Sequence, residues 1–148
     1  MKPGELREQI WSALMRARAV SYPLPPHGHH PNFIGAARAA EHLLEHPRVA
    51  ALPSLVVGPE RALYPLRKLA LARGKILYVP DQKRAGWYLR LEGEPKAAQL
   101  KNMPQFGEPK LRPEGARGVV LACVGVSRAG ERLSKGFGWG AAELNLGI

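Results

Sequence analysis

The hydrophobic and polar positions of the chain predict two amphipathic helices in its first third. Residues 4–19 carry apolar side chains at helical spacing, at Leu6, Ile10, Leu14 and Ala17. Residues 34–46 show the same spacing, and Pro47 is expected to end that helix. A helix with one apolar stripe must pack that stripe against another part of the protein, so the first helix is expected to dock through its apolar face.

The middle of the chain alternates short apolar runs with a third helix. The runs SLVVGP (54–59), KILYVP (75–80) and GWYLRL (86–91) are typical of buried strands. Residues 60–74 between the first two are expected to be helical, with Pro65 in the first turn and Gly74 as the stop. Continuous rather than alternating apolar runs favour a mostly parallel sheet that is covered on both faces. The sequence therefore predicts an α/β fold.

The last third begins with a polar stretch and ends with glycines. Residues 92–118 are predicted to be a loop with a short helix at about 96–100. The run GVVLACVGVS (118–127) is predicted to be the strongest strand, and the glycine-rich GERLSKGFGWGAAEL (130–144) follows it directly. Ligands of open α/β sheets bind beyond the carboxyl ends of strands, so a site is expected over residues 125–140.

Composition narrows the class of protein only in part. A chain of 148 residues with 45% hydrophobic residues is expected to form one domain, residues 1–148. The formal net charge is +10, which suits anions such as nucleotides, acidic cofactors, nucleic acid or acidic lipid, without choosing among them. Cys123 is the single cysteine, which fits a reducing compartment. No segment approaches the roughly 20 apolar residues of a membrane span, so a cytoplasmic protein is expected.

Three histidines lie close together in the loop SYPLPPHGHHPNF (21–33). Imidazoles at His27, His29 and His30 are possible metal ligands. Neither a cysteine nor a second spaced ligand pair accompanies them, and the prolines limit how the rings converge. The interpretation we favour is a loop that lines a cleft, with no metal site.

The glycine-rich segment carries the best candidates for phosphate contacts. Arg132 and Lys135 stand among glycines after a buried run, where backbone can approach an anion closely. The segment lacks the Gly-Lys-Ser/Thr of a Walker loop and the later acidic residue of a dinucleotide fingerprint. From these residues alone, a ligand loop and a plain turn are equally supported.

The same segment resembles a motif of the 5-formyltetrahydrofolate cyclo-ligase (methenyltetrahydrofolate synthetase) family. That motif has the form Gly-x-Arg-Leu-Gly-x-Gly-Gly-Gly-Tyr-Tyr-Asp. The positions that match are Gly130, Arg132, Leu133, Gly136 and Gly138, with Trp139 at the first aromatic position. ELREQIW (5–11) resembles the family's first helix and KILYVP its second strand, so the resemblance spans about residues 5–143. HHPNFIG (29–35) is similar to a divergent, cyclo-ligase-related branch.

The resemblance implies a fold, an activity and a set of ligands. The family has a three-layer αβα sandwich with a mostly parallel central sheet. It uses ATP and Mg²⁺ to convert 5-formyltetrahydrofolate, a reduced folate, to 5,10-methenyltetrahydrofolate. The resemblance implies ATP contacts from Arg7, from Arg132 and from the segment Leu133, Ser134, Lys135, Gly136 and Gly138, with Trp139 stacked on a ring. Catalytic residues are not assigned.

Three positions depart from the family motif. Ser134 and Phe137 stand where the motif has glycine, and Ala141 stands where it has the aspartate that helps to hold Mg²⁺. The chain is also expected to be shortened at its C-terminus relative to the family. The alternative hypothesis is therefore a non-catalytic nucleotide- or RNA-binding module that keeps the fold, although no RRM-type or KH-type signature is present.

Overall fold

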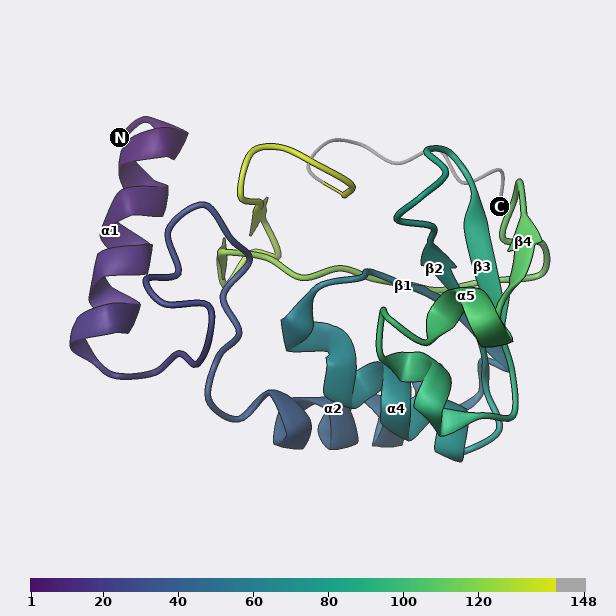
Figure 1. Cartoon of the computed structure of the whole chain (residues 1–148). Coiled ribbons are helices and arrows are strands. Elements are labelled where there is room, and N and C mark those ends of the chain that lie inside the picture. Colours follow the sequence, from purple (N-terminus) through teal and green to yellow (C-terminus); the bar gives the residue numbers. More distant parts are fainter. Residues whose placement is uncertain (141–148) are drawn as a thin grey trace.

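A five-stranded sheet with the order β4-β3-β2-β1-β5 forms the centre of the computed structural model, which describes residues 1–140 (Figure 1). Its strands are β1 (Ser54–Val57), β2 (Ile76–Pro80), β3 (Tyr88–Leu91), β4 (Glu108–Lys110) and β5 (Val119–Val120). The strands β6 (Gly125–Val126) and β7 (Arg132–Leu133) form a separate antiparallel hairpin. The helices are α1 (Pro3–Arg16), α2 (Ala36–Glu45), α3 (Pro47–Ala50), η1 (Arg61–Leu63), α4 (Tyr64–Ala72), η2 (Pro95–Ala98) and α5 (Met103–Phe106).

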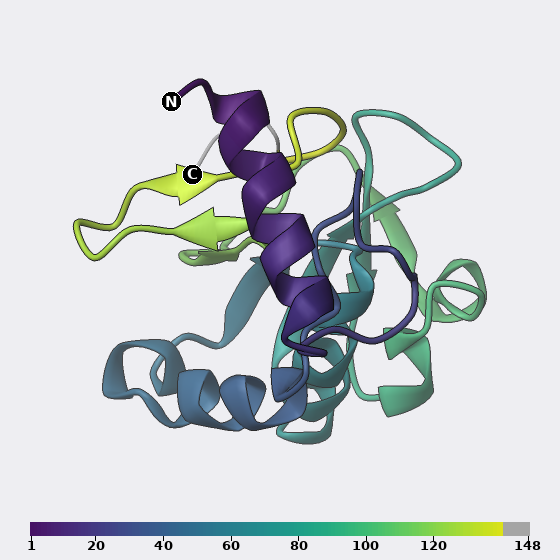
Figure 2. The ribbon, with the colours of Figure 1, turned by 90° about the vertical axis from the view of Figure 1, so that its left-hand side faces the viewer.

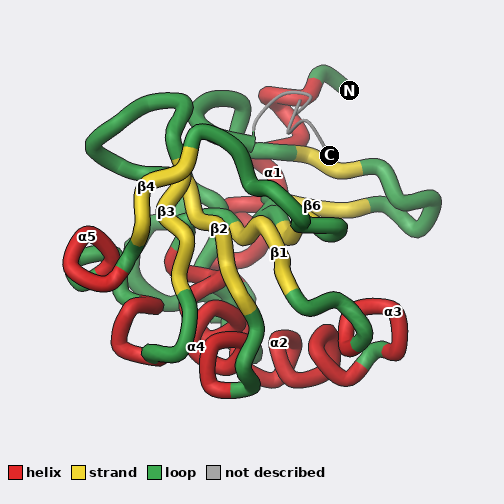
Figure 3. The backbone as a smooth tube through the Cα atoms, turned by 90° about the vertical axis from the view of Figure 1, so that its right-hand side faces the viewer, coloured by secondary structure: helices red, strands yellow, loops and turns green. Residues whose placement is uncertain are grey.

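One face of the sheet carries the main hydrophobic core. Alternate strand residues point to this face, because successive side chains of a strand lie on opposite sides. They are Leu55, Val57, Leu77, Val79, Leu89 and Leu91, and they pack against buried residues of α2, α4, η2 and α5. Figure 3 shows α2 and α4 side by side along the sheet. The α/β fold class is confirmed.

The other face of the sheet has a smaller core, made of loop segments rather than helices among the described residues. Val56, Tyr78 and Tyr88 pack there with Ala116, and Trp139 lies against the same cluster. The Tyr78 hydroxyl donates a 2.9 Å hydrogen bond to the Glu114 carbonyl, which ties the loop to β2. The glycine-rich segment is therefore attached to the sheet through Trp139.

Helix α1 lies beside the β6–β7 hairpin, away from the main core (Figure 2). A Cβ atom at Gly125 of β6 would lie only 2.9 Å from Ile10 Cδ1, so glycine permits this close packing. The Trp11 indole donates to the His29 carbonyl at 3.0 Å and holds the histidine loop on the same helix. Helix α1 thus joins the beginning of the chain to the glycine-rich segment.

The prediction of a single long strand at residues 118–127 is wrong, because this run forms two separate strands. The run divides into β5, which pairs parallel with β1, and β6, which pairs antiparallel with β7. Val119 and Val126 are 37% and 69% exposed, so the run is not a fully buried central strand. The chain leaves the sheet edge after Val120 because its next hydrogen-bonding partner is the strand of the glycine-rich segment.

The sheet is mixed. β1 pairs parallel with β2 and β5, as expected, whereas β3 and β4 extend the sheet antiparallel beyond β2. The antiparallel turn is possible because only residues 81–87 join β2 to β3, which is too short for a parallel crossover. The strand β4 and the helix α5 lie in the stretch that the sequence predicted as mostly loop. Tyr64 begins α4, and Pro65 occupies its first turn as predicted.

Candidate functional site

The glycine-rich segment turns back over the edge of the sheet through glycines with left-handed backbone. Gly136 has φ +98° and Gly138 has φ +81°, conformations that side chains with a Cβ atom rarely adopt. Ser134 and Phe137, which replace family glycines, are not strained, because Arg18 is the only non-glycine with positive φ among residues 1–140. The positions of Ser134 and Phe137 therefore do not require the left-handed backbone that favours glycine.

Arg7 reaches this segment from α1. Its Nε donates a 2.7 Å hydrogen bond to the Ser134 carbonyl. A Cβ atom at Gly136 would lie 3.1–3.3 Å from the three guanidinium atoms Cζ, Nη1 and Nη2. Arg7 is thus brought from α1 to the turn of the segment, as predicted for a shared site, and glycine at position 136 leaves room for its guanidinium.

Arg132 has a different role in the described structure. Its Nη1 donates to the Gly140 carbonyl at 2.6 Å, and its Nε and Nη2 donate to the Ala122 carbonyl at 3.2 and 2.6 Å. The guanidinium thus ties Gly140 of the glycine-rich segment to Ala122, which lies between β5 and β6, through backbone oxygens. The predicted contact between Arg132 and a phosphate stays a prediction.

The other predicted residues are divided between packing and the open side of the segment. Leu133 pairs with Gly125 in the hairpin, and Trp139 packs against the sheet. The buried Ser134 hydroxyl accepts a 3.1 Å hydrogen bond from the Gly136 amide. The Lys135 ammonium lies 4.7 Å from the centre of the Phe137 ring. Ala141, where the family has its aspartate, lies outside the described residues.

Lys135 lines a cavity of about 380 Å³ at the carboxyl ends of β1 and β2. Glu60 and Arg61 follow β1, Gln82 follows β2, and His29 and His30 come from the histidine loop. Four separate segments therefore meet here, as expected for the ligand-binding edge of an α/β sheet. The expectation that the histidine loop lines a cleft is confirmed.

His30 and Glu60 form a buried pair in this cavity. Their side chains are 1% and 12% exposed, and His30 Nδ1 lies 3.6 Å from Glu60 Oε1. Burial, reinforced by Lys135 and Arg132, lowers the pKa of His30 from its usual 6.5 to about 4. Burial also raises the pKa of Glu60, against the opposing influence of backbone hydrogen bonding and nearby cations. Both shifts favour the neutral forms.

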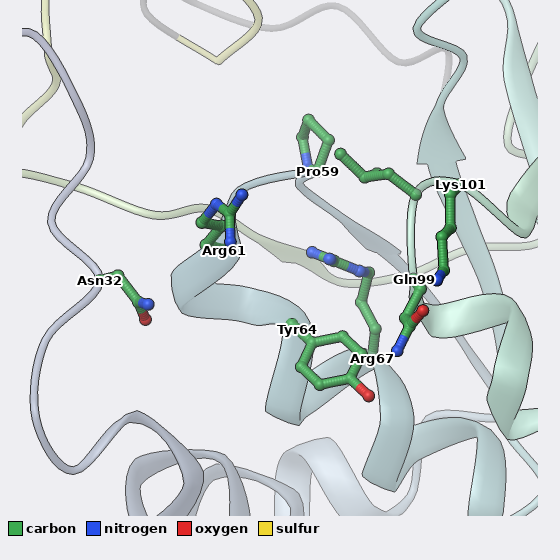
Figure 4. A pocket seen from close by; sticks show the side chains of 8 residues that line it. Asn32, Pro59, Arg61, Tyr64, Arg67, Gln99 and Lys101 are labelled. Carbon is green, nitrogen blue, oxygen red and sulfur yellow. The ribbon is translucent and has the colours of Figure 1, made fainter. Parts of the chain in front are cut away.

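A second cavity of about 420 Å³ adjoins the first, with Pro59 and Arg61 in the lining of both (Figure 4). Arg67 and Lys101 add positive charge to it, and Asn32, Tyr64, Gln99 and Leu100 complete its lining. The residues that line it include three cationic side chains and no carboxylate. This cavity is suited to the anionic part of a ligand.

Arg67 holds the wall between these cavities together. It is 1% exposed, and its Nη1 donates to the carbonyls of Gly58 and Glu60 at 2.9 and 2.8 Å, while its Nε donates to Ala98 at 3.0 Å. Burial lowers its pKa to about 10, which leaves the guanidinium charged at neutral pH. In Figure 4 it reaches from α4 toward the segment that carries Pro59.

The described residues do not supply a magnesium site. No group of three histidine, cysteine or carboxylate side chains lies together within residues 1–140. Glu60 is the one carboxylate that lines the cavity beside Lys135. Mg²⁺ usually binds through one or two carboxylates together with substrate phosphates and water. The donor set that is described here therefore does not define a resident ion.

Glu60, Arg61 and Arg67 were missed as site residues by sequence reasoning. One signal was available for Arg67: it lies four residues after Leu63 and three before Ala70, on the apolar side of α4. A charged side chain on a buried helix face needs partners, and here backbone carbonyls supply them. The pair His30–Glu60 joins residues thirty positions apart, and nothing in the spacing indicated it.

Fold and site together define an α/β protein with two basic cavities at the carboxyl edge of its sheet. The chain matches the 5-formyltetrahydrofolate cyclo-ligase family over residues 2–147. The protein belongs to this family.

Named relatives come from several vertebrates. Methenyltetrahydrofolate synthase domain-containing protein from Bos taurus is 30% identical over 159 residues, covering 96% of this chain and 40% of that protein. The proteins of the same name from Mus musculus and Homo sapiens are 30% and 27% identical, covering 95% and 96% of this chain and 41% and 40% of theirs. The chain thus spans about 40% of the length of these relatives. No solved structure matches it.

The resemblance predicts that this segment binds phosphate, and replacing Gly136 with alanine should then weaken that binding about tenfold, since positive φ costs a side chain roughly 1 kcal/mol or more and Arg7 must also move. Isothermal titration calorimetry with ATP measures the effect. Gly74→Ala is the matched control, because Gly74 has φ +83° but open space around it. Equal loss of affinity in both variants, or none in Gly136→Ala, would contradict the prediction that this segment binds phosphate.

Proposed function

We propose that this chain is an ATP-dependent 5-formyltetrahydrofolate cyclo-ligase. The observation that carries the proposal is the position of Lys135. Its side chain lines a cavity at the carboxyl edge of the sheet, and its backbone belongs to the segment that resembles the phosphate motif of the family. Membership of the family supports the reaction class, and the cavity supplies a place for it.

The phosphates of ATP are assigned to the side of the cavity that faces the glycine-rich segment. Lys135 offers a point charge there, and the guanidinium of Arg7 lies beside Gly136. Positive-φ glycines let backbone approach an anion without a side chain in the way. We assign the direct contacts to Lys135 and Arg7 before Arg132, because Arg132 already donates to the carbonyls of Ala122 and Gly140.

The reduced folate is assigned to the second cavity. Its carboxylates would meet the cation Lys101, and its ring system would lie near Tyr64 and Arg61, at the end that adjoins the first cavity. Arg61 lines both cavities, so ATP in the first cavity and the folate in the second would lie next to each other at Arg61. This arrangement supports the direct contact between two substrates that the reaction requires.

The reaction balances without a redox partner. The formyl oxygen on N5 attacks the γ-phosphorus of ATP, and ADP leaves. N10 then attacks the activated carbon, phosphate departs with the former formyl oxygen, and N10 loses its proton to give the methenyl bridge. The chain's part is to bring the two ligands together and to neutralise phosphate charge with Arg7, Arg61 and Lys135. No step is assigned to Mg²⁺.

Titration calorimetry of the chain with ATP and with 5-formyltetrahydrofolate tests the binding part of the proposal. We expect each ligand to bind alone, and ATP affinity to fall in Arg7→Gln. A chain that binds neither ligand would overturn the proposal. The non-catalytic alternative predicts instead steeply salt-dependent binding of RNA that survives Arg132→Ala.

A cytoplasmic location belongs to the proposal as well. No helix within residues 1–140 has the length and apolar character to cross a membrane.

A further inference from the structure

His30 connects three segments that line the proposed site: its own loop, the segment that follows β1 and the glycine-rich segment. Its Nε2 lies 3.2 Å from the Lys135 backbone nitrogen, and its Nδ1 faces Glu60 Oε1 at 3.6 Å. Its own loop is fixed to α1 through the bond from Trp11 to His29. Lys135 and His30 are 105 residues apart, so a single imidazole joins distant parts of the chain.

The direction of the hydrogen bond fixes the state of the ring. A backbone N–H can only donate, so Nε2 must accept and carries no proton. The proton of the neutral ring therefore sits on Nδ1, pointing at Glu60. Within the described part of the chain, His30 Nδ1 and Glu60 Oε2 are buried without a hydrogen-bond partner. An N–H held 3.6 Å from a carboxyl oxygen needs only a small shift to close that bond.

We propose that His30 is a positioning residue: its neutral, Nδ1-protonated ring holds the Lys135 backbone, and through it the glycine-rich segment, over the cavity beside Glu60. Its effect on ATP affinity rests on the proposed function, whereas its effect on the segment does not. His30 does not contact the ligand in this account. It acts by fixing where the Lys135 side chain enters the cavity.

Charged and titratable groups surround His30 from every side of the cavity. Glu60 faces it from the end of β1, Lys135 and Arg132 act on it from the glycine-rich segment, and Arg67 acts on Glu60 from α4. His29 and Arg61 line the same cavity. Protonation of His30 would turn Nε2 into a donor that faces another donor, with Lys135 and Arg132 adding repulsion, and would release the segment.

The sign of the pH effect follows from the lowered pKa of His30. The folded protein binds the proton less well than the unfolded chain, so the contribution of His30 is complete above pH 6.5 and is lost as the pH falls toward 4. The raised pKa of Glu60 acts in the opposite sense. A comparison with His30→Gln isolates the histidine, because the glutamine amide oxygen accepts from Lys135 and does not titrate.

Two measurements on the ligand-free chain test the inference directly. Nitrogen NMR at pH 7 should show the Nδ1–H tautomer of His30. Hydrogen exchange of the Lys135 amide should be about tenfold faster in His30→Leu, which lacks an acceptor, and close to wild type in His30→Gln. His42→Gln on the exposed side of α2 is the control. An Nε2–H tautomer, an imidazolium at pH 7, or unchanged exchange in His30→Leu would overturn the inference.

Calorimetry with ATP then separates the inference from the proposed function. We expect about tenfold weaker ATP binding in His30→Leu, rescue in His30→Gln, and loss of affinity as the pH falls toward 4 in wild type but not in His30→Gln. If the wild-type chain binds no ATP, the proposed function fails and the NMR and exchange results still decide the inference. Because the NMR measurement uses the wild-type chain, it holds even if His30→Leu does not fold.

Discussion

Replacing Arg67 with methionine is expected to lower the free energy of unfolding by about 3 kcal/mol, and the melting temperature by roughly 10 °C. Methionine fills a similar volume but leaves the carbonyls of Gly58, Glu60 and Ala98 without their donor. Each buried acceptor that loses its partner carries the cost of desolvation. Urea unfolding followed by circular dichroism measures the difference.

Two further variants make the expectation for Arg67 specific. Arg67→Lys keeps the charge but cannot span three carbonyls from one planar group, so most of the loss should remain. Arg73→Met changes an exposed arginine just after α4 and should move the free energy of unfolding by less than about 0.5 kcal/mol. If Arg67→Met is as stable as Arg73→Met, the hydrogen bonds of Arg67 do not hold the wall between the cavities.

Replacing Lys135 with glutamine is expected to weaken ATP binding about thirtyfold while leaving the melting temperature unchanged. The lysine side chain lines the cavity and, within residues 1–140, makes a ring contact with Phe137 and no hydrogen bond. A charge-assisted contact to phosphate contributes roughly 1.5–3 kcal/mol, which corresponds to about ten- to a hundredfold in affinity. Calorimetric titration of ATP at fixed salt measures the change.

The control for Lys135 is Lys68→Gln, which removes the same charge from an exposed position of α4. Both variants lower the net charge by the same amount. The comparison therefore tests whether ATP affinity depends on the overall charge of the protein or on the contact between Lys135 and phosphate. Parallel losses in the two variants would mean that ATP responds only to the overall +10 charge. A loss in Lys135→Gln alone supports the local contact.

Local patterns predicted the helices and the central strands, because each depends on residues close together in the chain. The spacing of Leu6, Ile10 and Leu14 was sufficient for α1, and the apolar runs located β1 and β2. The prediction of one strand over residues 118–127 was wrong, because the division of this run depends on pairing with residues 132–133, which the composition of the run does not reveal. Strand direction is likewise a tertiary property.

Only the part of the candidate site that is contiguous in the sequence could be predicted. The glycines, with Arg132 and Leu133, carry a recognisable motif around Lys135, and Lys135 lines a cavity in the structure. Arg132, predicted from the same motif, donates instead to the backbone carbonyls of Ala122 and Gly140. Glu60, His30 and Arg67 belong to the site through burial and distance, which arise only when separate segments pack together.

The production of 5,10-methenyltetrahydrofolate, followed by its absorbance, tests the central claim most directly. With 5-formyltetrahydrofolate, ATP and Mg²⁺ supplied together, the account predicts a rise in absorbance that requires ATP and is lost or much slowed in Lys135→Gln. A trace that stays at the rate of the mixture without protein, from a wild-type chain shown to be folded, would contradict the claim that this chain is a cyclo-ligase.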